Sequence, residues 1–116
     1  MLTIYGIANC DTIKKTRRWL EAAGYEFEFH DYKKLGCSAE LAETLIANIP
    51  LEELVNKRGT TWRKLSEHEK ENLTLSNAAA LIQRETSVIK RPIIHNGDKW
   101  QVGFNEDALR AFLSNN

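Results

Sequence analysis

The chain has 116 residues, and its 16 lysines and arginines balance its 16 aspartates and glutamates to a formal net charge of zero. A neutral chain has no general attraction for nucleic acid or an anionic membrane, and the 42% hydrophobic and 28% charged residues exclude a disordered chain. No apolar run reaches the ~18 residues that a spanning helix needs, and the start lacks a secretory leader. We therefore expect one cytoplasmic domain over residues 1–116 that binds neither nucleic acid directly nor a membrane.

The first thirty residues predict a strand, a helix and a second strand. Residues 2–7 form a short apolar run, and Asn9–Thr12 contains the residue types that begin helices. Gly24 is expected to end the helix, after which aromatic and polar residues alternate over residues 25–29, as in a half-buried strand. The helix is expected to bury Ile13, Thr16, Leu20 and Ala23.

Residues 38 to about 89 have helical periodicity throughout, which predicts a series of short helices. Pro50 separates the first two helices, and Ser76 or Asn77 is expected to begin the last one. Between them, the segment Asn56–Thr61 is polar and contains a glycine, which predicts a loop whose side chains are free to take part in chemistry.

The last quarter of the chain returns to strands and ends in a helix. Pro92–His95 and Lys99–Gly103 flank the pair Asn96-Gly97, the strongest short signal for a hairpin turn. Asn105 is expected to cap the final helix. This order of elements predicts an α/β fold with a mixed four-stranded sheet, interrupted by a helical insert at about residues 38–89.

Cys10 stands where the first strand passes into the first helix. Its sulfur can approach the unpaired N–H groups and the positive end of that helix, both of which favour a thiolate. Lys14, one turn further on, adds positive charge, and Asp11 opposes it. We therefore expect a pKa below the ~8.5 of a free cysteine. The alternative is a small buried hydrophobic residue without chemistry.

A dithiol redox motif would need a second cysteine three residues after Cys10, where Ile13 stands. A single thiolate can attack a disulfide, a glutathionyl adduct or an oxyanion, but the adduct must then be resolved by another thiol, usually from a second molecule. Cys37 is a candidate for that resolving thiol, but nothing in the spacing brings it near Cys10, and the alternative is an incidental cysteine. The three histidines and two cysteines show no ligand spacing, so no metal site is expected.

Two further features admit more than one interpretation. The Arg91-Pro92 bond precedes the third strand, a place where cis proline occurs, although ~95% of such bonds are trans. The first helix also has a basic face that is either solvated or meets an acidic partner. This face consists of Lys14, Lys15, Arg17 and Arg18.

Taken together, four segments make the chain resemble the arsenate reductase/Spx family, and most of all its YffB branch. The segments are Tyr5–Lys15, Asn56–Leu65, Lys90–Ile94 and Val102–Phe104. The resemblance runs from about Leu2 to Leu113 and implies a thioredoxin-like fold with a helical insert.

The resemblance also implies roles for individual residues. The nucleophilic cysteine of the family corresponds to Cys10, and the cis proline that faces it corresponds to Pro92. Family arsenate reductases hold an oxyanion with three arginines, whose planar guanidinium groups suit bidentate binding, and two of these match Arg58 and Arg91. The segment around Gly103 carries no third arginine. The arsenate site is therefore incomplete.

The YffB branch implies a glutathione-dependent thiol reductase, which fits a site with one cysteine. We expect Cys10 to attack a disulfide or a glutathione mixed disulfide, with substrate binding by Lys14, Arg58, Arg91 and Pro92. No bound cofactor is expected, and glutathione is the expected co-substrate. Two alternatives stay open: an arsenate reductase with an incomplete arginine site, and a non-catalytic Spx-like regulator that binds RNA polymerase. The Spx redox switch requires the cysteine that Ile13 replaces.

Overall fold

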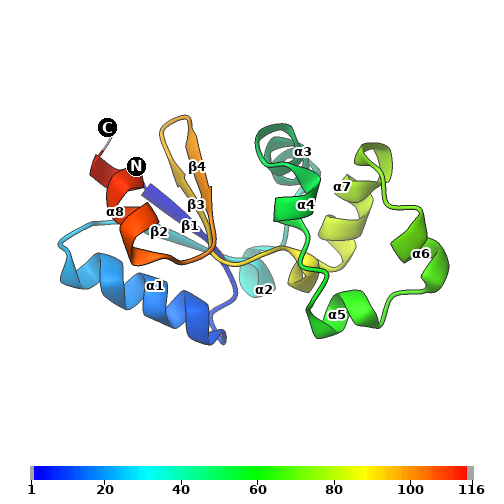
Figure 1. The fold of residues 1–116 in the computed structure, drawn as a ribbon, viewed down its shortest axis with the longest axis horizontal. Coiled ribbons are helices and arrows are strands. Elements are labelled where there is room, and N and C mark those ends of the chain that lie inside the picture. Colours follow the sequence, from blue (N-terminus) through cyan, green and yellow to red (C-terminus); the bar gives the residue numbers. More distant parts are fainter. Residues whose placement is uncertain (1, 115–116) are drawn as a thin grey trace. The chain divides into compact units, whose positions relative to one another are not determined.

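The two ends of the chain build a four-stranded sheet in the computed structural model, which describes residues 2–114 (Figure 1). β1 (Leu2–Gly6) pairs in parallel with β2 (Glu28–Asp31) and antiparallel with β3 (Ile93–Asn96), which pairs antiparallel with β4 (Lys99–Val102). The strand order is β2-β1-β3-β4. The predicted mixed α/β sheet is confirmed, and the β-α-β start with its β-β-α end makes the fold thioredoxin-like.

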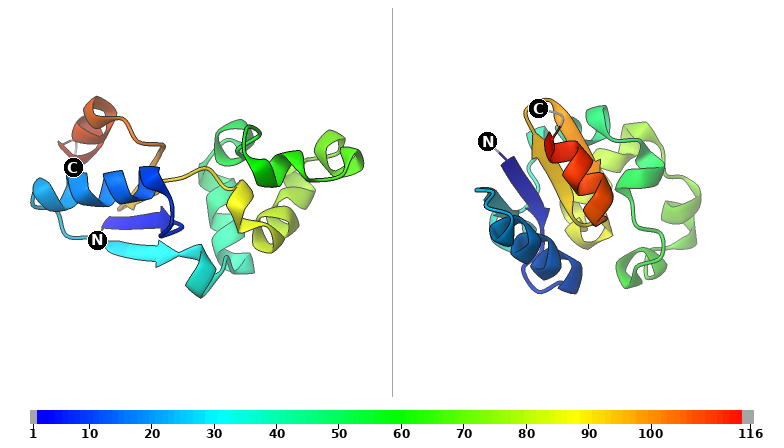
Figure 2. Two further views of the ribbon diagram at one scale, coloured as in Figure 1. Left: turned by 90° about the horizontal axis from the view of Figure 1, so that it is seen from below. Right: turned by 60° about the vertical axis from the view of Figure 1, so that its left-hand side comes forward.

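Two helices cover one face of this sheet. α1 (Asp11–Ala22) connects β1 to β2, and α8 (Glu106–Ser114) follows β4; Figure 2 shows both on the same side of the sheet. Strand side chains alternate between faces, so every second residue of β1 and β3 faces these helices. The buried core between them consists of Leu2, Ile4, Ile13, Leu20, Ile94, Leu109 and Leu113.

The sequence of α1 accounts for its buried face and for its end. Thr16 is buried, and its hydroxyl donates to the carbonyl of Thr12 at 2.7 Å, which satisfies the polar group inside the core. Gly24 has a φ of 84°, a left-handed conformation that favours glycine and ends the helix as predicted. The prediction that Ala23 is buried is wrong, because this residue caps the helix at its exposed end.

The second strand is shorter than predicted. Its pairing with β1 begins at Glu28, opposite Thr3, so residues 25–27 lie outside the ladder and Tyr25 is 39% exposed. Strand residues need a neighbouring strand for their backbone hydrogen bonds, and alternation of side chains alone does not supply one. A short helix that the sequence pattern did not indicate, α2 (Tyr32–Leu35), follows β2 directly.

The predicted hairpin is confirmed, but its turn lies one residue further along the chain. Asn96 still pairs with Lys99, so the loop consists of Gly97 and Asp98 rather than Asn96 and Gly97. Gly97 has a φ of 67°, and no residue other than glycine has a positive φ in the described part of the chain. A positive φ at the first central position alone is the pattern of a type II′ turn, which takes glycine there.

The chain divides into two compact units. One contains the sheet, α1, α2 and α8 and is formed by the chain up to Leu35 and from Arg91 onward; the other is Gly36–Lys90. The predicted helical insert falls within this second unit, while the organisation of the whole chain as one domain stays a prediction. The second unit contains α3 (Ala39–Asn48), α4 (Leu51–Leu54), α5 (Thr60–Arg63), α6 (Glu67–Glu71), α7 (Leu75–Arg84) and the 3₁₀ turn η1 (Thr86–Val88).

Two boundaries in the second unit differ from the predicted ones. α7 begins after Thr74 rather than at Ser76 or Asn77, because Thr74 and Asn77 form a reciprocal cap in which the Asn77 side chain accepts from the Thr74 N–H at 2.9 Å. The loop predicted over Asn56–Thr61 is shorter, since Thr60 already begins α5. The start of α7 is therefore set by the cap between Thr74 and Asn77.

Residues 2–114 contain neither a cluster of metal-ligating side chains nor a helix that could span a membrane. No three or more histidine, cysteine, aspartate or glutamate side chains gather there in a way that could hold a metal ion. None of the helices there combines the length and the apolar character needed to cross a membrane.

Candidate active site

Cys10 is the residue that immediately precedes α1. Its backbone is extended, with φ −148° and ψ 124°, and its carbonyl accepts the first helical hydrogen bond from the Lys14 N–H at 3.0 Å. The side chain is half-buried beside the core that α1 forms with the sheet. The predicted position of Cys10 at the start of the first helix is confirmed, so its sulfur is next to N–H groups that have no partner within the helix.

The environment of Cys10 favours the thiolate. Burial by itself raises the pKa of the thiol, but the Ile13 N–H, a hydrogen bond from Arg91, the charge of Arg91 and the Thr12 N–H together lower the pKa below its ordinary value. From the sequence, the lowered pKa is expected to come from the helix end and from Lys14. The helix end contributes, whereas the cation that lowers the pKa is Arg91, and Lys14 has an exposed side chain.

Arg91 is therefore expected to control the pH at which Cys10 becomes reactive. Replacing Arg91 by alanine removes both a donor and a positive charge from the thiolate, so the pKa of Cys10 should rise and alkylation should require a higher pH. The pH dependence of the iodoacetamide rate measures this shift. Arg18→Ala, which removes an exposed cation from α1, is the control. An unchanged midpoint in Arg91→Ala would contradict the assignment.

Cys37, the second cysteine, has the opposite character. It is 8% exposed, and burial raises the pKa of its thiol to about 11. At pH 7 such a pKa leaves about one side chain in ten thousand as thiolate. Cys10 should therefore be alkylated much faster than Cys37, which peptide mapping after limiting iodoacetamide measures. Equal labelling would mean that Cys10 is only a packing residue.

Pro92 follows Arg91 through a cis peptide bond, as the family resemblance implied. The residue is buried, and its carbonyl accepts a hydrogen bond from the Gly103 N–H at 2.8 Å. That bond connects the start of β3 to the segment after β4, residues 103–105, which contains no arginine. Contact between Pro92 and Cys10 stays a prediction.

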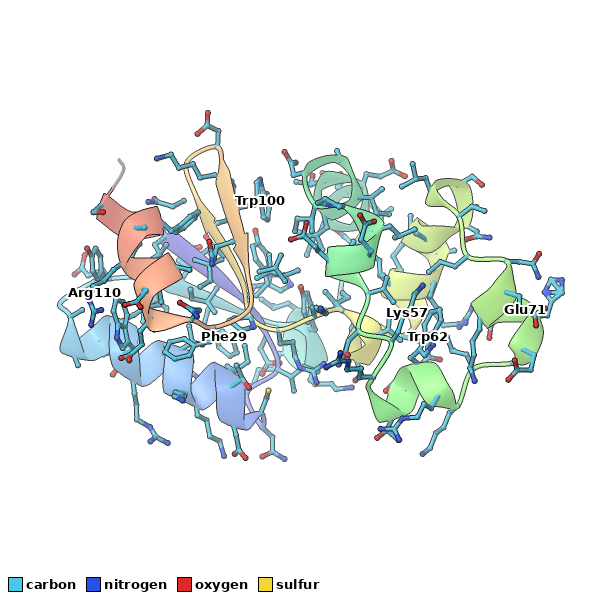
Figure 3. The ribbon with its side chains drawn as sticks, in the orientation of Figure 1. Phe29, Lys57, Trp62, Glu71, Trp100 and Arg110 are labelled. Atoms are coloured by element: carbon cyan, nitrogen blue, oxygen red, sulfur yellow. The ribbon has the colours of Figure 1, made fainter. Side chains whose placement is uncertain are left out.

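Arg58 lies in the second unit, in the loop between α4 and α5. Its N–H donates to Asn56 Oδ1 at 3.1 Å, and its carbonyl accepts from Arg63 Nη2 at 2.8 Å. Hydrogen bonds to two side chains therefore fix the loop backbone at Arg58. Its neighbour Lys57 lies over the ring of Trp62, with 5.4 Å between the ammonium and the ring centre (Figure 3). The predicted role of Arg58 in binding the substrate of Cys10 stays a prediction.

Arg58 also lines a pocket of about 330 Å³ that has a strongly cationic wall. Three of its six lining residues are basic and one is acidic, which suits an anion. Lys57 is adjacent to Arg58 in the sequence, whereas Lys90 becomes its neighbour only because the segment before Arg91 pairs with the end of α4, where the Lys90 N–H donates to the Leu54 carbonyl at 2.8 Å. The lining residues are Glu52, Val55, Asn56, Lys57, Arg58 and Lys90.

The sequence model of the ArsC family matches residues 5–112. This chain belongs to the ArsC family. An uncharacterized protein of Haemophilus influenzae is 40% identical to it over 111 residues, which cover 96% of this chain and 97% of the relative. The global transcriptional regulator Spx of Streptococcus pyogenes is 30% identical over 116 residues, which cover 98% of this chain and 86% of the regulator.

Solved structures of ArsC-family relatives have the same fold. A protein named YFFB superposes with a TM-score of 0.91 at 39% identity, over 96% of this chain and 97% of its own. An arsenate reductase related protein from Brucella melitensis gives 0.78 at 43% identity, over 97% and 93%. The expected family, its YffB-like branch and the likeness to Spx are thus confirmed, and the arsenate reductase-like relatives place the chain among candidate thiol oxidoreductases.

Proposed function

We propose that this ArsC-family chain is a glutathione-dependent monothiol reductase with Cys10 as its nucleophile. The observation that carries the proposal is the Cys10 sulfur at the start of α1, with a pKa lowered by N–H groups and by Arg91. Ile13, which occupies the place of a second redox cysteine, is fully buried in the core. The resolving thiol must therefore come from another molecule.

The proposed reaction consists of two thiol–disulfide exchanges. The Cys10 thiolate attacks the glutathione sulfur of a glutathionylated substrate, forms a Cys10–glutathione disulfide and releases the substrate as a thiolate, which takes a proton from water. A glutathione thiolate then attacks the glutathione sulfur of that disulfide, so oxidised glutathione leaves and the Cys10 thiolate returns. Across both steps, one glutathione thiol enters a disulfide and one substrate thiol is released, so the disulfide bond passes from the substrate to a second glutathione and the enzyme is unchanged.

In this proposal Arg58 and Arg91 hold the glycine carboxylate of glutathione, Lys14 adds positive charge at the entrance, and backbone at Pro92 aligns the peptide.

A charged, bidentate hydrogen-bond pair contributes about 1.5–3 kcal/mol, so Arg58→Ala or Arg91→Ala should weaken glutathione binding about ten- to a hundredfold. Lysine at either position should restore part of the loss, because an ammonium lacks the planar fork. Titration of a Cys10→Ser background measures both effects, and unchanged affinity would contradict this role.

One assay separates the proposed reaction from arsenate reduction. The purified chain is incubated with glutathione and either a glutathionylated protein or arsenate, and oxidised glutathione is measured against the rate without protein. We expect turnover with the mixed disulfide and little with arsenate, because the segment around Gly103 provides no third arginine. Faster turnover of arsenate would replace the proposal by an arsenate reductase.

A binding role is the second candidate, and the 30% identity to the regulator Spx over nearly the whole chain supports it. In that case the chain would bind RNA polymerase without the redox switch, because Ile13 stands where the switch needs a cysteine. Pull-down of purified RNA polymerase by the wild-type chain and by Cys10→Ser distinguishes the two roles. Equal capture by both, with no glutathione turnover, would favour the regulator.

A further inference from the structure

A separate pocket of about 260 Å³ lies at the carboxyl end of the parallel strands β1 and β2. Ala8 lines it from the loop that leads to Cys10, and Asp31 lines it from the last position of β2. α/β sheets commonly bind ligands at this edge. All six lining residues belong to the unit that contains Cys10. They are Ala8, Arg17, Phe29, Asp31, Lys34 and Leu35.

Arg17 lines this pocket, and one of its hydrogen-bond donors has no acceptor within residues 2–114. Its guanidinium carbon lies 4.3 Å from the ring centre of Phe29, which fixes the plane of the group on the side of β2 (Figure 3 labels Phe29). Its Nε is buried and has no hydrogen-bond partner among the described residues. Buried donors are normally bonded, so the Nε of Arg17 is available to an acceptor from a ligand.

The other charged groups of the pocket define what that ligand carries. Asp31 is buried, and its Oδ1 accepts from the Lys33 N–H at 2.9 Å, which leaves its other oxygen as an acceptor. In residues 2–114 neither Arg17 nor Lys34 forms an ion pair with Asp31. The pocket thus presents two cations and one carboxylate that do not neutralise one another by direct contact.

A ligand with only a carboxylate would be attracted by Arg17 and Lys34 but repelled by Asp31. An α-amino-acid head group, which has an ammonium next to its carboxylate, pairs with both signs of charge. We infer that this pocket binds such a head group, with the carboxylate on Arg17 and Lys34 and the ammonium on Asp31. The inference rests on the proposed function, since the γ-glutamyl end of glutathione is the part of that substrate with this head group.

The distance from Cys10 fits this ligand. Ala8 and Cys10 are two residues apart, so their Cα atoms are separated by at most ~7 Å. A disulfide places the two cysteine Cα atoms ~5.5–6 Å apart, and the γ-glutamyl link is longer than one extended residue of ~3.5 Å. Glutathione joined to Cys10 can therefore extend its γ-glutamyl head past Ala8 into the pocket.

The test measures ligand binding in the full chain with Cys10→Ser, so that no exchange reaction occurs. The two probes are S-methylglutathione and S-methylcysteinylglycine, which lacks the γ-glutamyl group. We expect S-methylglutathione to bind at least tenfold more tightly, and Arg17→Ala to remove this preference. Arg18→Ala, an exposed neighbour with the same charge change, should retain it.

Asp31 is tested with a third probe, S-methyl-glutarylcysteinylglycine, which keeps the carboxylate and lacks the ammonium. Asp31→Asn still accepts the Lys33 N–H, so α2 should persist, but the variant should bind S-methylglutathione several-fold more weakly and the glutaryl probe no more weakly. Equal loss for both probes would overturn the role of Asp31. An Arg17→Ala variant that retains the preference for S-methylglutathione would overturn the site.

Turnover separates the failure of this site from the failure of the proposed function. If Arg17→Ala reduces a glutathione mixed disulfide as fast as the wild-type chain, the proposed function stands and the proposed γ-glutamyl site is refuted. If the chain binds S-methylglutathione through Arg17 but does not turn over the mixed disulfide, the proposed site stands and the proposed reaction is refuted. Thermal unfolding of each variant shows whether the fold is intact.

Discussion

Cys10→Ser is expected to reduce the turnover of a glutathione mixed disulfide to the rate without protein. A serine hydroxyl has nearly the size of a thiol, but it is not ionised at neutral pH and cannot form the mixed disulfide that the reaction requires. Loss of a nucleophile that forms the covalent intermediate typically lowers the rate by about three orders of magnitude or more. The rate of formation of oxidised glutathione measures the effect.

Cys37→Ser is the matched control for that experiment. It removes the same atom type from a residue that is buried and whose pKa is raised to about 11, so the rate should stay near that of the wild type. Mass spectrometry of the wild-type chain after oxidised glutathione should also find the adduct on Cys10. A large loss of rate in Cys37→Ser together with an intact fold would instead indicate an internal resolving thiol.

The position of Cys10 could be predicted because it depends on local features. A short apolar run, polar helix-starting residues and a basic helix follow one another in the sequence, so the start of α1 was evident without any distant contact. The influence of Arg91 on the thiol could not be derived from spacing, because the two residues come together only when β3 pairs with β1. The family resemblance implied a role for Arg91 in the site. The structure shows that a hydrogen bond from Arg91 and its charge lower the pKa of Cys10.

The errors in the predicted elements have a common cause. Residues 25–27 have the alternation of a strand but no partner strand, and α7 begins after Thr74 rather than at Ser76 or Asn77 because the Asn77 side chain bonds back to Thr74. In both cases the pattern of a segment was correct and its hydrogen-bond partners were not visible in the sequence. The same limit applies to the Arg17 pocket, because a basic helix face has the same pattern whether or not an aromatic ring lies beneath one of its residues.

Gly6→Ala is expected to be among the most destabilising single substitutions in the sheet. A Cβ at this position would lie 2.8 Å from Cγ1 of Ile13 and closer still to its Cδ1. Ile13 is fully buried in the core and has little room to move, so the extra methyl group should cost about 1–3 kcal/mol of unfolding free energy. Urea denaturation followed by circular dichroism measures the loss.

A double-mutant cycle with Ile13→Val tests that the cause is this contact. Valine removes Cδ1, which by itself should cost about 0.5–1.5 kcal/mol through lost packing. Combined with Gly6→Ala it removes the atom that the new methyl group would meet, so the double variant should be more stable than the sum of the two single losses predicts. Additive losses would mean that the cost of alanine at position 6 arises elsewhere in the strand.

The same cycle connects packing to reactivity. The N–H of Ile13 is one of the groups that lower the pKa of Cys10, and Gly6 is the position whose lack of a side chain lets Ile13 pack at the start of α1. Gly6→Ala should therefore raise the pH needed for alkylation of Cys10, and Ile13→Val in the same chain should lower it again. A variant that loses stability but keeps the wild-type pH profile would show that the first turn of α1 keeps its geometry when Ile13 is displaced.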